Sequence, residues 1–197
     1  MAPGPGDKTP GPGEDARVAR TRADVSRAAL GVLTDEGSDA VTHARVAELA
    51  GYSKTTLYTH WPSRVDLIVL AVDALGELPH HERTGNLRDD IIGELEAFRG
   101  GITEMRLDLI LTGMAQWASV EEMRVIRDKI NNSGQGQMRA MLGEILDGAE
   151  LEAALSMLTG VVACPSIMFG TLPDDDVIAA AVDIVLRSAQ RRKAFKR

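Results

Sequence analysis

The sequence is poor in the features that mark secreted and membrane proteins. Its 197 residues include a single cysteine, Cys164, which excludes an internal disulfide and agrees with a reducing compartment. There is no apolar run of about eighteen residues, so we expect no transmembrane helix. The N-terminus has no apolar signal core. These absences predict a cytoplasmic protein with no membrane partner.

The patterns of common catalytic sites are also missing. No Walker-type or dinucleotide-binding glycine pattern occurs. The four histidines lie in no recognised catalytic spacing: His43, His60, His80 and His81. Adjacent side chains in a loop rarely converge on one ion, so His80 and His81 do not indicate a metal site. We therefore expect no enzyme, no cofactor and no metal, and keep a small-molecule enzyme as an alternative class.

Aromatic residues are scarce at 4%, so aliphatic side chains and methionine must fill the core. With 44% apolar and 26% charged residues, the composition is that of a globular protein of one domain or two small ones. The net charge of −7 does not predict a nucleic-acid binder. Seven basic and five acidic residues nevertheless fall between Ala16 and Arg64, a charge of +2 that leaves −9 for the remainder. A mildly basic head on an acidic body fits contact with DNA through one end.

Residues 42–62 have the pattern of two short helices joined by a tight turn. Thr42 can cap the first helix, and Gly51 stands where a helix end needs a left-handed residue. Ser53 can cap a second helix, Lys54–His60, which ends at Trp61 because the residue before proline is pushed out of helical space. The first helix has an expected buried side: Val46, Ala47, Leu49 and Ala50. Two short helices around a glycine turn describe a helix-turn-helix.

The second helix has an unusual surface. Leu57 and Trp61 lie on one stripe and can anchor the helix to its neighbours. The other positions carry hydroxyls, one ammonium and one imidazole, but no carboxylate: Lys54, Thr55, Thr56, Tyr58, Thr59 and His60. Hydroxyls bond phosphates or base edges, and an acid-free face suits a polyanion. The alternative is an ordinary solvated face.

Residues 46–61 resemble the DNA-binding signature of TetR/AcrR-family transcriptional regulators. The matching positions are Val46-Ala47, Ala50-Gly51, Ser53, Leu57-Tyr58, His60, Ser63 and Leu67. The chain departs from the family pattern at Trp61, where Phe is usual, and at Arg64, where Lys is usual. The similarity is specific over roughly residues 20–75. Together, the surface and the resemblance predict contacts with a double-stranded DNA operator by Thr42, Arg45, Ser53, Lys54, Thr55, Thr56, Tyr58, Thr59, His60 and Arg64.

The rest of the chain has helical periodicity and no strand pattern, so we expect an all-α protein of about nine helices. Residues 1–15 are rich in Pro and Gly and should form a disordered tail. We assign the helix-turn-helix domain to residues 16–62, a linking helix to 63–80 and a helical C-terminal domain to 81–197. Arg17, Arg20 and Arg22 at the start of the first helix contact phosphate or merely favour solubility, two alternatives that the sequence leaves open.

Within the C-terminal domain, the first helix should begin near Asn86 and break at Gly100-Gly101. An apolar helix follows over 102–117. A long one follows over 121–147, with a weak middle at Asn131–Gly136 that leaves open whether it is one helix or two. Pro165 should bend a helix over 151–169, and a last helix should span 174–190, with an inner face of Val177, Ala180, Ala181, Ile184 and Val185.

The resemblance also implies partners. It implies a homodimer through about residues 151–169 and 174–190, and an effector pocket in the C-terminal domain whose unknown small ligand, apolar or amphipathic, releases DNA. Candidate lining residues are Phe98, Met105, Met114, Trp117, Met138, Met141, Met168 and Phe169, each of which could instead be core. Most members of the family repress transcription, so repression is expected. A regulator that binds DNA without any ligand is the alternative.

Overall fold

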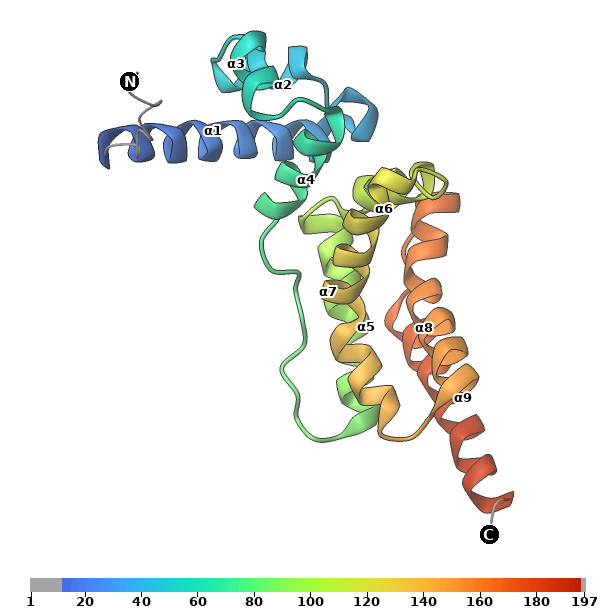
Figure 1. Ribbon diagram of the computed structural model, residues 1–197. Coiled ribbons are helices and arrows are strands. Elements are labelled where there is room, and N and C mark those ends of the chain that lie inside the picture. The colour runs from blue at the N-terminus through green and yellow to red at the C-terminus, as the bar shows by residue number, and fades with distance from the viewer. Residues whose placement is uncertain (1–11, 196–197) are drawn as a thin grey trace, which may run out of the picture.

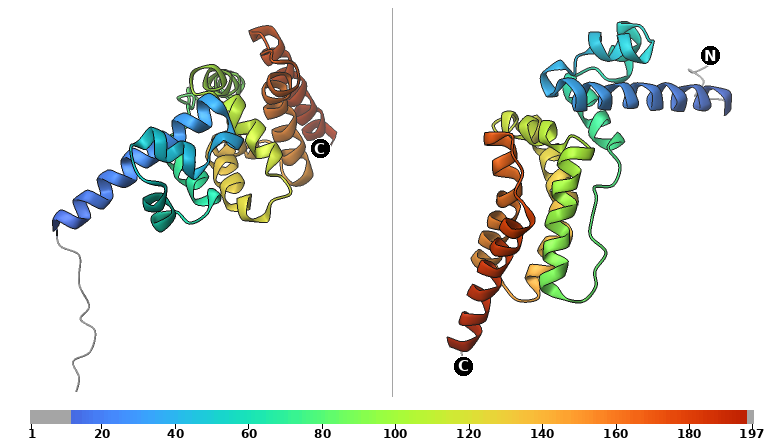
Figure 2. Two further views of the ribbon diagram at one scale, coloured as in Figure 1. Left: turned by 90° about the horizontal axis from the view of Figure 1, so that it is seen from above. Right: turned by 180° about the vertical axis from the view of Figure 1, so that it is seen from behind.

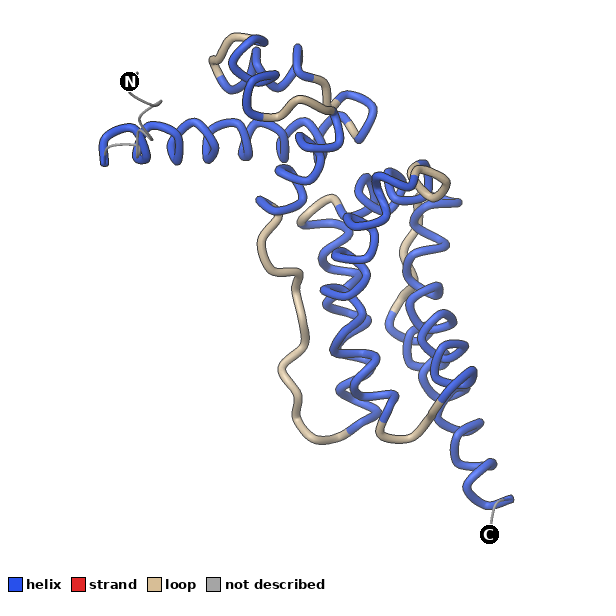
Figure 3. The backbone as a smooth tube through the Cα atoms, in the orientation of Figure 1, coloured by secondary structure: helices blue, strands red, loops and turns tan. Residues whose placement is uncertain are grey.

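The computed structural model describes residues 12–195, and side chains from residue 17 to residue 190 (Figure 1). All regular structure in this range is helical, which confirms the expected all-α fold (Figure 3). The described chain contains nine α-helices and two 3-10 turns: α1 (Pro12–Glu36), η1 (Ser38–Ala40), α2 (His43–Ala50), α3 (Lys54–His60), α4 (Arg64–Ala74), α5 (Leu87–Glu104), α6 (Leu107–Gln116), η2 (Glu121–Met123), α7 (Arg124–Gly143), α8 (Gly148–Phe169) and α9 (Asp175–Phe195).

Helices α1 to α4 form a head at one end of the molecule (Figure 1). The long α1 is its base, and it packs against α4 and α2. The head buries Val25, Val46, Leu57 and Leu67 with no exposed surface. Burying each such aliphatic side chain stabilises the fold by about 1.5–3 kcal/mol. The short α3 therefore holds its position through a packed core, because an isolated helix of this length is unstable in water.

The body consists of α5, α7, α8 and α9, which run along one another, with α6 across the end nearest the head (Figures 1 and 2). Helix α6 is the main bridge to the head, since it contacts both α1 and η1. At this junction the Ser38 hydroxyl donates a hydrogen bond to Gln116 Oε1 at 2.7 Å. The head and body thus meet through α6 as well as through the chain that follows α4.

That connecting chain, residues 75–86, is called the strap here, and it runs along one side of the body to the start of α5 (Figure 1). Two carboxylates one turn apart on α5 hold it. Asp90 is fully buried and accepts hydrogen bonds from the Thr84 N–H and hydroxyl, both at 2.7 Å, and from the Gly85 N–H at 3.1 Å. These hydrogen bonds, first of all the Thr84 hydroxyl, lower the pKa of Asp90 to about 2. Glu94 holds His80 and His81 in the same way, at 2.7 Å from His80 Nδ1 and 3.0 Å from the His81 N–H.

Two predicted boundaries near the head were wrong. Helix α1 begins at Pro12, so residues 12–15 are helical and do not belong to the predicted tail of residues 1–15. Proline fits the first turn of a helix because an N–H is not needed there. The remainder of that tail lies outside the described residues. The linking helix, assigned to residues 63–80, ends at Ala74, and Gly76 has the left-handed φ of 77° that leads into the strap.

Two expectations within the body were also wrong. Helix α5 passes through Gly100-Gly101 and ends at Glu104, so the apolar helix that follows is α6 and starts at Leu107 rather than 102. A Cβ on Gly101 would lie 2.8 Å from Leu107 Cδ1 and 3.1 Å from Pro79 Cγ, so this glycine permits close packing instead of ending the helix. The question left open for Asn131–Gly136 has a clear answer: these residues lie inside one uninterrupted helix, α7.

The predicted inner faces were only partly correct. Leu49 on α2 is 51% exposed, although it was expected to be buried, and Val69 on α4 is 37% exposed. A short helix that packs on one side buries a single narrow stripe, and these two positions lie at its border. On α9 the buried stripe contains Ile178 and Val182, which were not on the predicted face of Val177, Ala180, Ala181, Ile184 and Val185. Val185 alone of that face is buried.

Candidate nucleic-acid interface and internal cavity

The turn between α2 and α3 forms as its local chemistry predicts. Gly51 ends α2 in the left-handed region, at φ 73° and ψ 28°. The Thr42 hydroxyl caps α2 by accepting from the Arg45 N–H at 3.2 Å, and the Ser53 hydroxyl caps α3 by accepting from the Thr56 N–H at 3.1 Å. These caps satisfy N–H groups that have no partner within either helix. The two helices are therefore fixed by interactions that a few neighbouring residues supply.

Helix α3 is anchored on one side and open on the other. Leu57 and Trp61 are buried in the head, as predicted. The exposed side consists of Lys54, Thr55, Tyr58, Thr59 and His60. Thr56 is half-buried, and its hydroxyl lies 2.8 Å from that of Ser53. Since α3 has no acidic residue, the face presents hydroxyls and cationic or neutral donors to solvent without a competing carboxylate.

A neighbouring ring supports the side chain of Tyr58, a contact that the sequence did not reveal. Its ring stacks on the ring of His43 with centroids 3.8 Å apart and planes 10° apart. His43 is itself buried, and its Nε2 lies 2.6 Å from the Trp61 carbonyl oxygen. Because a carbonyl only accepts, Nε2 carries the hydrogen. His43 thus joins the start of α2 to the end of α3 and orients an exposed tyrosine.

The two predicted arginine contacts face other groups in the head. The Arg64 guanidinium donates to the Val41 carbonyl at 3.1 Å and to the Ser38 carbonyl at 2.6 Å, and it pairs with Asp39. These bonds hold the loop before α2 to the start of α4. A structural role therefore explains Arg64 better than phosphate contact does.

Arg45 is paired with two carboxylates. Its guanidinium lies 2.7 Å from Glu36 Oε1 and 3.1 Å from Glu48 Oε2. The hydrogen bonds from Arg45 lower the pKa of Glu36 and keep the pair charged. A guanidinium flanked by two acids offers little positive potential to a phosphate, so the geometry gives Arg45 a place in the surface ion pairs.

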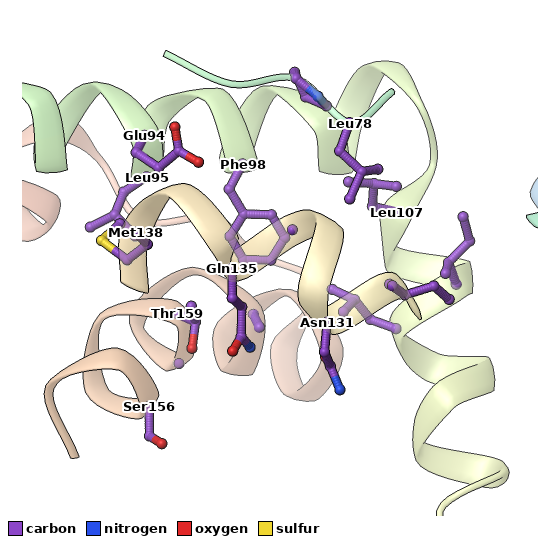
Figure 4. Close-up of a pocket in the computed structure, with 17 residues that line it drawn as sticks. Leu78, Glu94, Leu95, Phe98, Leu107, Asn131, Gln135, Met138, Ser156 and Thr159 are labelled. Atoms are coloured by element: carbon purple, nitrogen blue, oxygen red, sulfur yellow. The ribbon is translucent and has the colours of Figure 1, made fainter. Parts of the chain in front are cut away.

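A cavity of about 300 Å³ lies in the body between α5, α6, α7, α8 and the strap (Figure 4). Of the predicted lining residues, Phe98 and Met138 belong to it. Met141 and Trp117 are buried in the core instead, Met105 and Met114 pack against that core, and Met168 and Phe169 are 68% and 71% exposed at the end of α8. The prediction missed the polar part of the lining: Asn131, Gln135, Ser156 and Thr159.

The surface of α8 and α9 is unusually apolar. Exposed side chains there include Met157 at 56% and Ile184 at 53%. We expected no transmembrane helix, yet α8 is long and apolar enough to cross a membrane by length and composition, a criterion that core helices of soluble proteins also meet. A shallow groove of about 320 Å³ between α8 and α9 is lined by Met157, Ile184 and neighbouring residues.

Comparison with known proteins gives three consistent results. The family model described as bacterial regulatory proteins, tetR family, matches residues 25–71. An uncharacterized HTH-type transcriptional regulator of Mycobacterium tuberculosis is 26% identical over 166 residues, 80% of this chain and 81% of the other. A DNA-binding transcriptional repressor TetR of Mycobacteroides abscessus is 37% identical over 86 residues, which cover 43% of this chain and 45% of that protein.

Solved structures agree on the architecture. The crystal structure of the TetR family transcription regulator SCO0332 covers 84% of this chain and 97% of its own, with a TM-score of 0.56 and 24% identity. The flavonoid-responsive regulator FrrA covers 88% and 97%, with a TM-score of 0.58 and 18% identity. At these identities the likeness shows the fold, a helix-turn-helix head on a helical body. The family match covers residues 25–71, which contain the α2–α3 unit, so the chain is similar to TetR-family DNA-binding transcriptional regulators in this unit and in its fold.

Proposed function

We propose that this regulator is a repressor that binds its operator as a homodimer and leaves it when a small molecule occupies the cavity. The observation that carries DNA binding is the open face of α3, which is anchored by Leu57 and Trp61 and has no acid. A helix of this kind enters the major groove with its exposed side chains toward base edges. The proposed contacts are Thr42, Ser53, Lys54, Thr55, Thr56, Tyr58, Thr59 and His60.

The apolar surface of α8 and α9 supports a dimer. A monomer that exposes Met157 and Ile184 side by side along one groove leaves an apolar area in water, and such areas mark interaction sites. The same surface on a second copy would form a two-fold interface, with side chains of each copy entering the groove between α8 and α9 of the other. Two copies supply two α3 helices, which fits an operator of two half-sites about one helical turn apart.

The strap supports control by a ligand. Leu78 and Pro79 of the strap line the cavity, and the same segment leads directly from α4 of the head. A molecule in the cavity would therefore favour particular positions of the strap and, through α4, of the head. Such an effect requires that the ligand bind the DNA-bound and DNA-free arrangements of the protein with different affinities. Repression is favoured by the name of the Mycobacteroides relative, and ligand response by the name of the regulator FrrA.

The test starts with duplexes selected by the purified protein from a random pool. We expect a two-fold repeated sequence, bound by two copies, and loss of binding when a ligand of the cavity is added. Binding that no compound of a screened library weakens would favour the alternative, a regulator without effector, while turnover of a bound compound would favour an enzyme. We expect this regulator to act in the cytoplasm, where its DNA lies.

A further inference from the structure

Apolar side chains line most of the cavity, and its uncharged polar side chains lie on the side formed by α7 and α8. Helices α5 and α6 contribute Leu95, Phe98 and Ile110, and Figure 4 shows Phe98 pointing from α5 into the space. The opposite side, from α7 and α8, contributes the amide of Gln135 and the hydroxyl of Thr159. Thr159 donates to the Leu155 carbonyl at 2.8 Å, so its oxygen can still accept a hydrogen bond. Gln135 makes no hydrogen bond to the part of the chain that the structure describes, so both its donor and acceptor are available.

The only charged group in the lining is a carboxylate that is already bound. Glu94 is 4% exposed, and its oxygens accept from His80 Nδ1, from the His81 N–H and from Gln137 Nε2 at 3.0 Å. Among the seventeen lining residues of the described chain, none is lysine or arginine. The lining therefore offers one carboxyl group and no cation to a bound molecule.

The cations on α7 are all occupied away from the cavity. Lys129 pairs with Asp73 of α4, Arg139 pairs with Glu152 at 2.5 Å, and Arg124 pairs with Glu121 and Asp128. Arg127 donates to the carbonyls of Trp117 and Val120. An anion in the cavity would lose its hydration without gaining a cationic partner, and it would lie near the buried Glu94 carboxylate. That loss of hydration is costly in a largely apolar space.

We infer that the cavity selects an uncharged amphipathic molecule and rejects anions. Leu95, Phe98 and Ile110 contact the hydrocarbon body of the ligand, and the amide of Gln135 and the hydroxyl of Thr159 bind hydroxyl or carbonyl groups along one edge of it. The volume of about 300 Å³ is at the small end of ligand sites and suits two or three fused or linked rings. This inference rests on the proposed effector role of the cavity and specifies the class of its ligand.

A matched pair of fluorescent probes tests the inference on the full chain. N-Phenyl-1-naphthylamine is uncharged, and 8-anilino-1-naphthalenesulfonate is the same molecule with one sulfonate. Titration should show the uncharged probe binding at least about tenfold more tightly, because the sulfonate must be desolvated without a cation. Gly160→Leu locates the site: a Cβ there meets only Cys164 Sγ, at 3.7 Å, and the larger side chain fills the cavity. Gly136→Leu is the control, since Gly136 is exposed on α7 and has open space around it.

A change of charge should reverse the preference. Gln135→Lys places an ammonium in the lining and should improve the sulfonate relative to the uncharged probe by about tenfold or more. Asn132→Lys adds the same charge to an exposed position of α7 and should leave the ratio unchanged. If the wild type binds the sulfonate at least as tightly as the uncharged probe, and Gly160→Leu abolishes the binding of both probes, the charge selectivity is refuted while the effector role of the cavity stands. If neither probe binds, or Gly160→Leu changes neither titration, both the selectivity and the effector role are refuted.

Discussion

Replacing His43 should damage the DNA-binding head in a way that its position in the sequence does not suggest. His43 makes two interactions: its Nε2–H donates to the Trp61 carbonyl at 2.6 Å, and its ring supports that of Tyr58 at 3.8 Å. His43→Ala removes both. The hydrogen bond contributes about 0.5–1.5 kcal/mol and the ring pair about 0.5–1.5 kcal/mol, so the head should lose about 1–3 kcal/mol of stability.

The consequence for binding is separate from the consequence for stability. Without the His43 ring, the exposed Tyr58 loses its fixed orientation and must be ordered when DNA binds, so affinity should fall about tenfold. His43→Phe keeps a ring beneath Tyr58 but no hydrogen bond to Trp61. It should lower stability by about 1 kcal/mol and keep the affinity within about threefold of the wild type.

The measurement needs a signal from the head alone. The chain has two tryptophans, Trp61 in the head and Trp117 in the body. In a Trp117→Phe background, the fluorescence of Trp61 reports urea unfolding of the head, and anisotropy with a selected duplex reports affinity. If His43→Ala changes neither the stability of the head nor the affinity for DNA, or if His43→Phe weakens binding as much as His43→Ala does, the His43 ring has no role in orienting Tyr58.

Four further predictions follow from individual contacts. Lys54→Ala should weaken binding to all duplexes alike and reduce the salt slope of binding by about 1, which anisotropy at several salt concentrations measures. Thr55→Val should change the DNA sequence that the protein selects, which a repeated selection measures. Arg64→Ala should lower head stability by about 1.5–3 kcal/mol in the Trp61 assay, because two carbonyls and Asp39 lose their donor, and should leave the salt slope unchanged. Asp90→Asn should weaken the hold on the strap. The pKa of Asp90 is lowered from 3.8 to about 2, so its carboxylate stabilises the fold fully above about pH 4 and loses that effect as the pH falls through 2. The unfolding free energy of Asp90→Asn should therefore vary less with pH over this interval than that of the wild type. An equal variation in the two proteins would contradict the role given to Asp90. Ile184→Asp should yield monomers in light scattering, whereas Val125→Asp, at a still more exposed apolar position on α7, should leave dimers intact; dimers in both would exclude the α8–α9 surface.

The DNA-binding unit could be predicted closely because its determinants are local. Thr42, Gly51 and Ser53 each fix a helix end through atoms a few residues away, and Trp61-Pro62 ends α3 by a neighbouring steric effect. The open face of α3 follows from the same local pattern, once Leu57 and Trp61 are recognised as its anchors.

The contacts of Arg64 and His43 within the head could not be predicted, because their partners are distant in sequence. Arg64 bonds to Ser38 and Val41, and its match to a basic position of the family pattern suggested phosphate contact instead. His43 meets Tyr58 only after α2 and α3 pack together. In both cases tertiary geometry decides which of several plausible partners a side chain meets.

The cavity was the least predictable part of the molecule. Its lining depends on how four helices turn toward one another and on a strap that has no regular structure. The prediction favoured large apolar side chains, yet most of these fill the core, as Met141 does. The polar residues Asn131 and Gln135 were interpreted as a weak point of the helix, although they face the cavity. The glycine and the amides of this stretch therefore line a cavity within an intact helix and do not break it.

The most direct test of the account is a photo-cross-link from α3 to DNA. A benzophenone amino acid in place of Thr55 on the open face should cross-link to bases of a selected duplex, at two positions related by the two-fold repeat. The same amino acid at exposed Val125 on α7 should give no DNA cross-link. Cross-linking from position 125 but not from position 55 would show that the open face of α3 does not enter the groove, and would contradict the central claim.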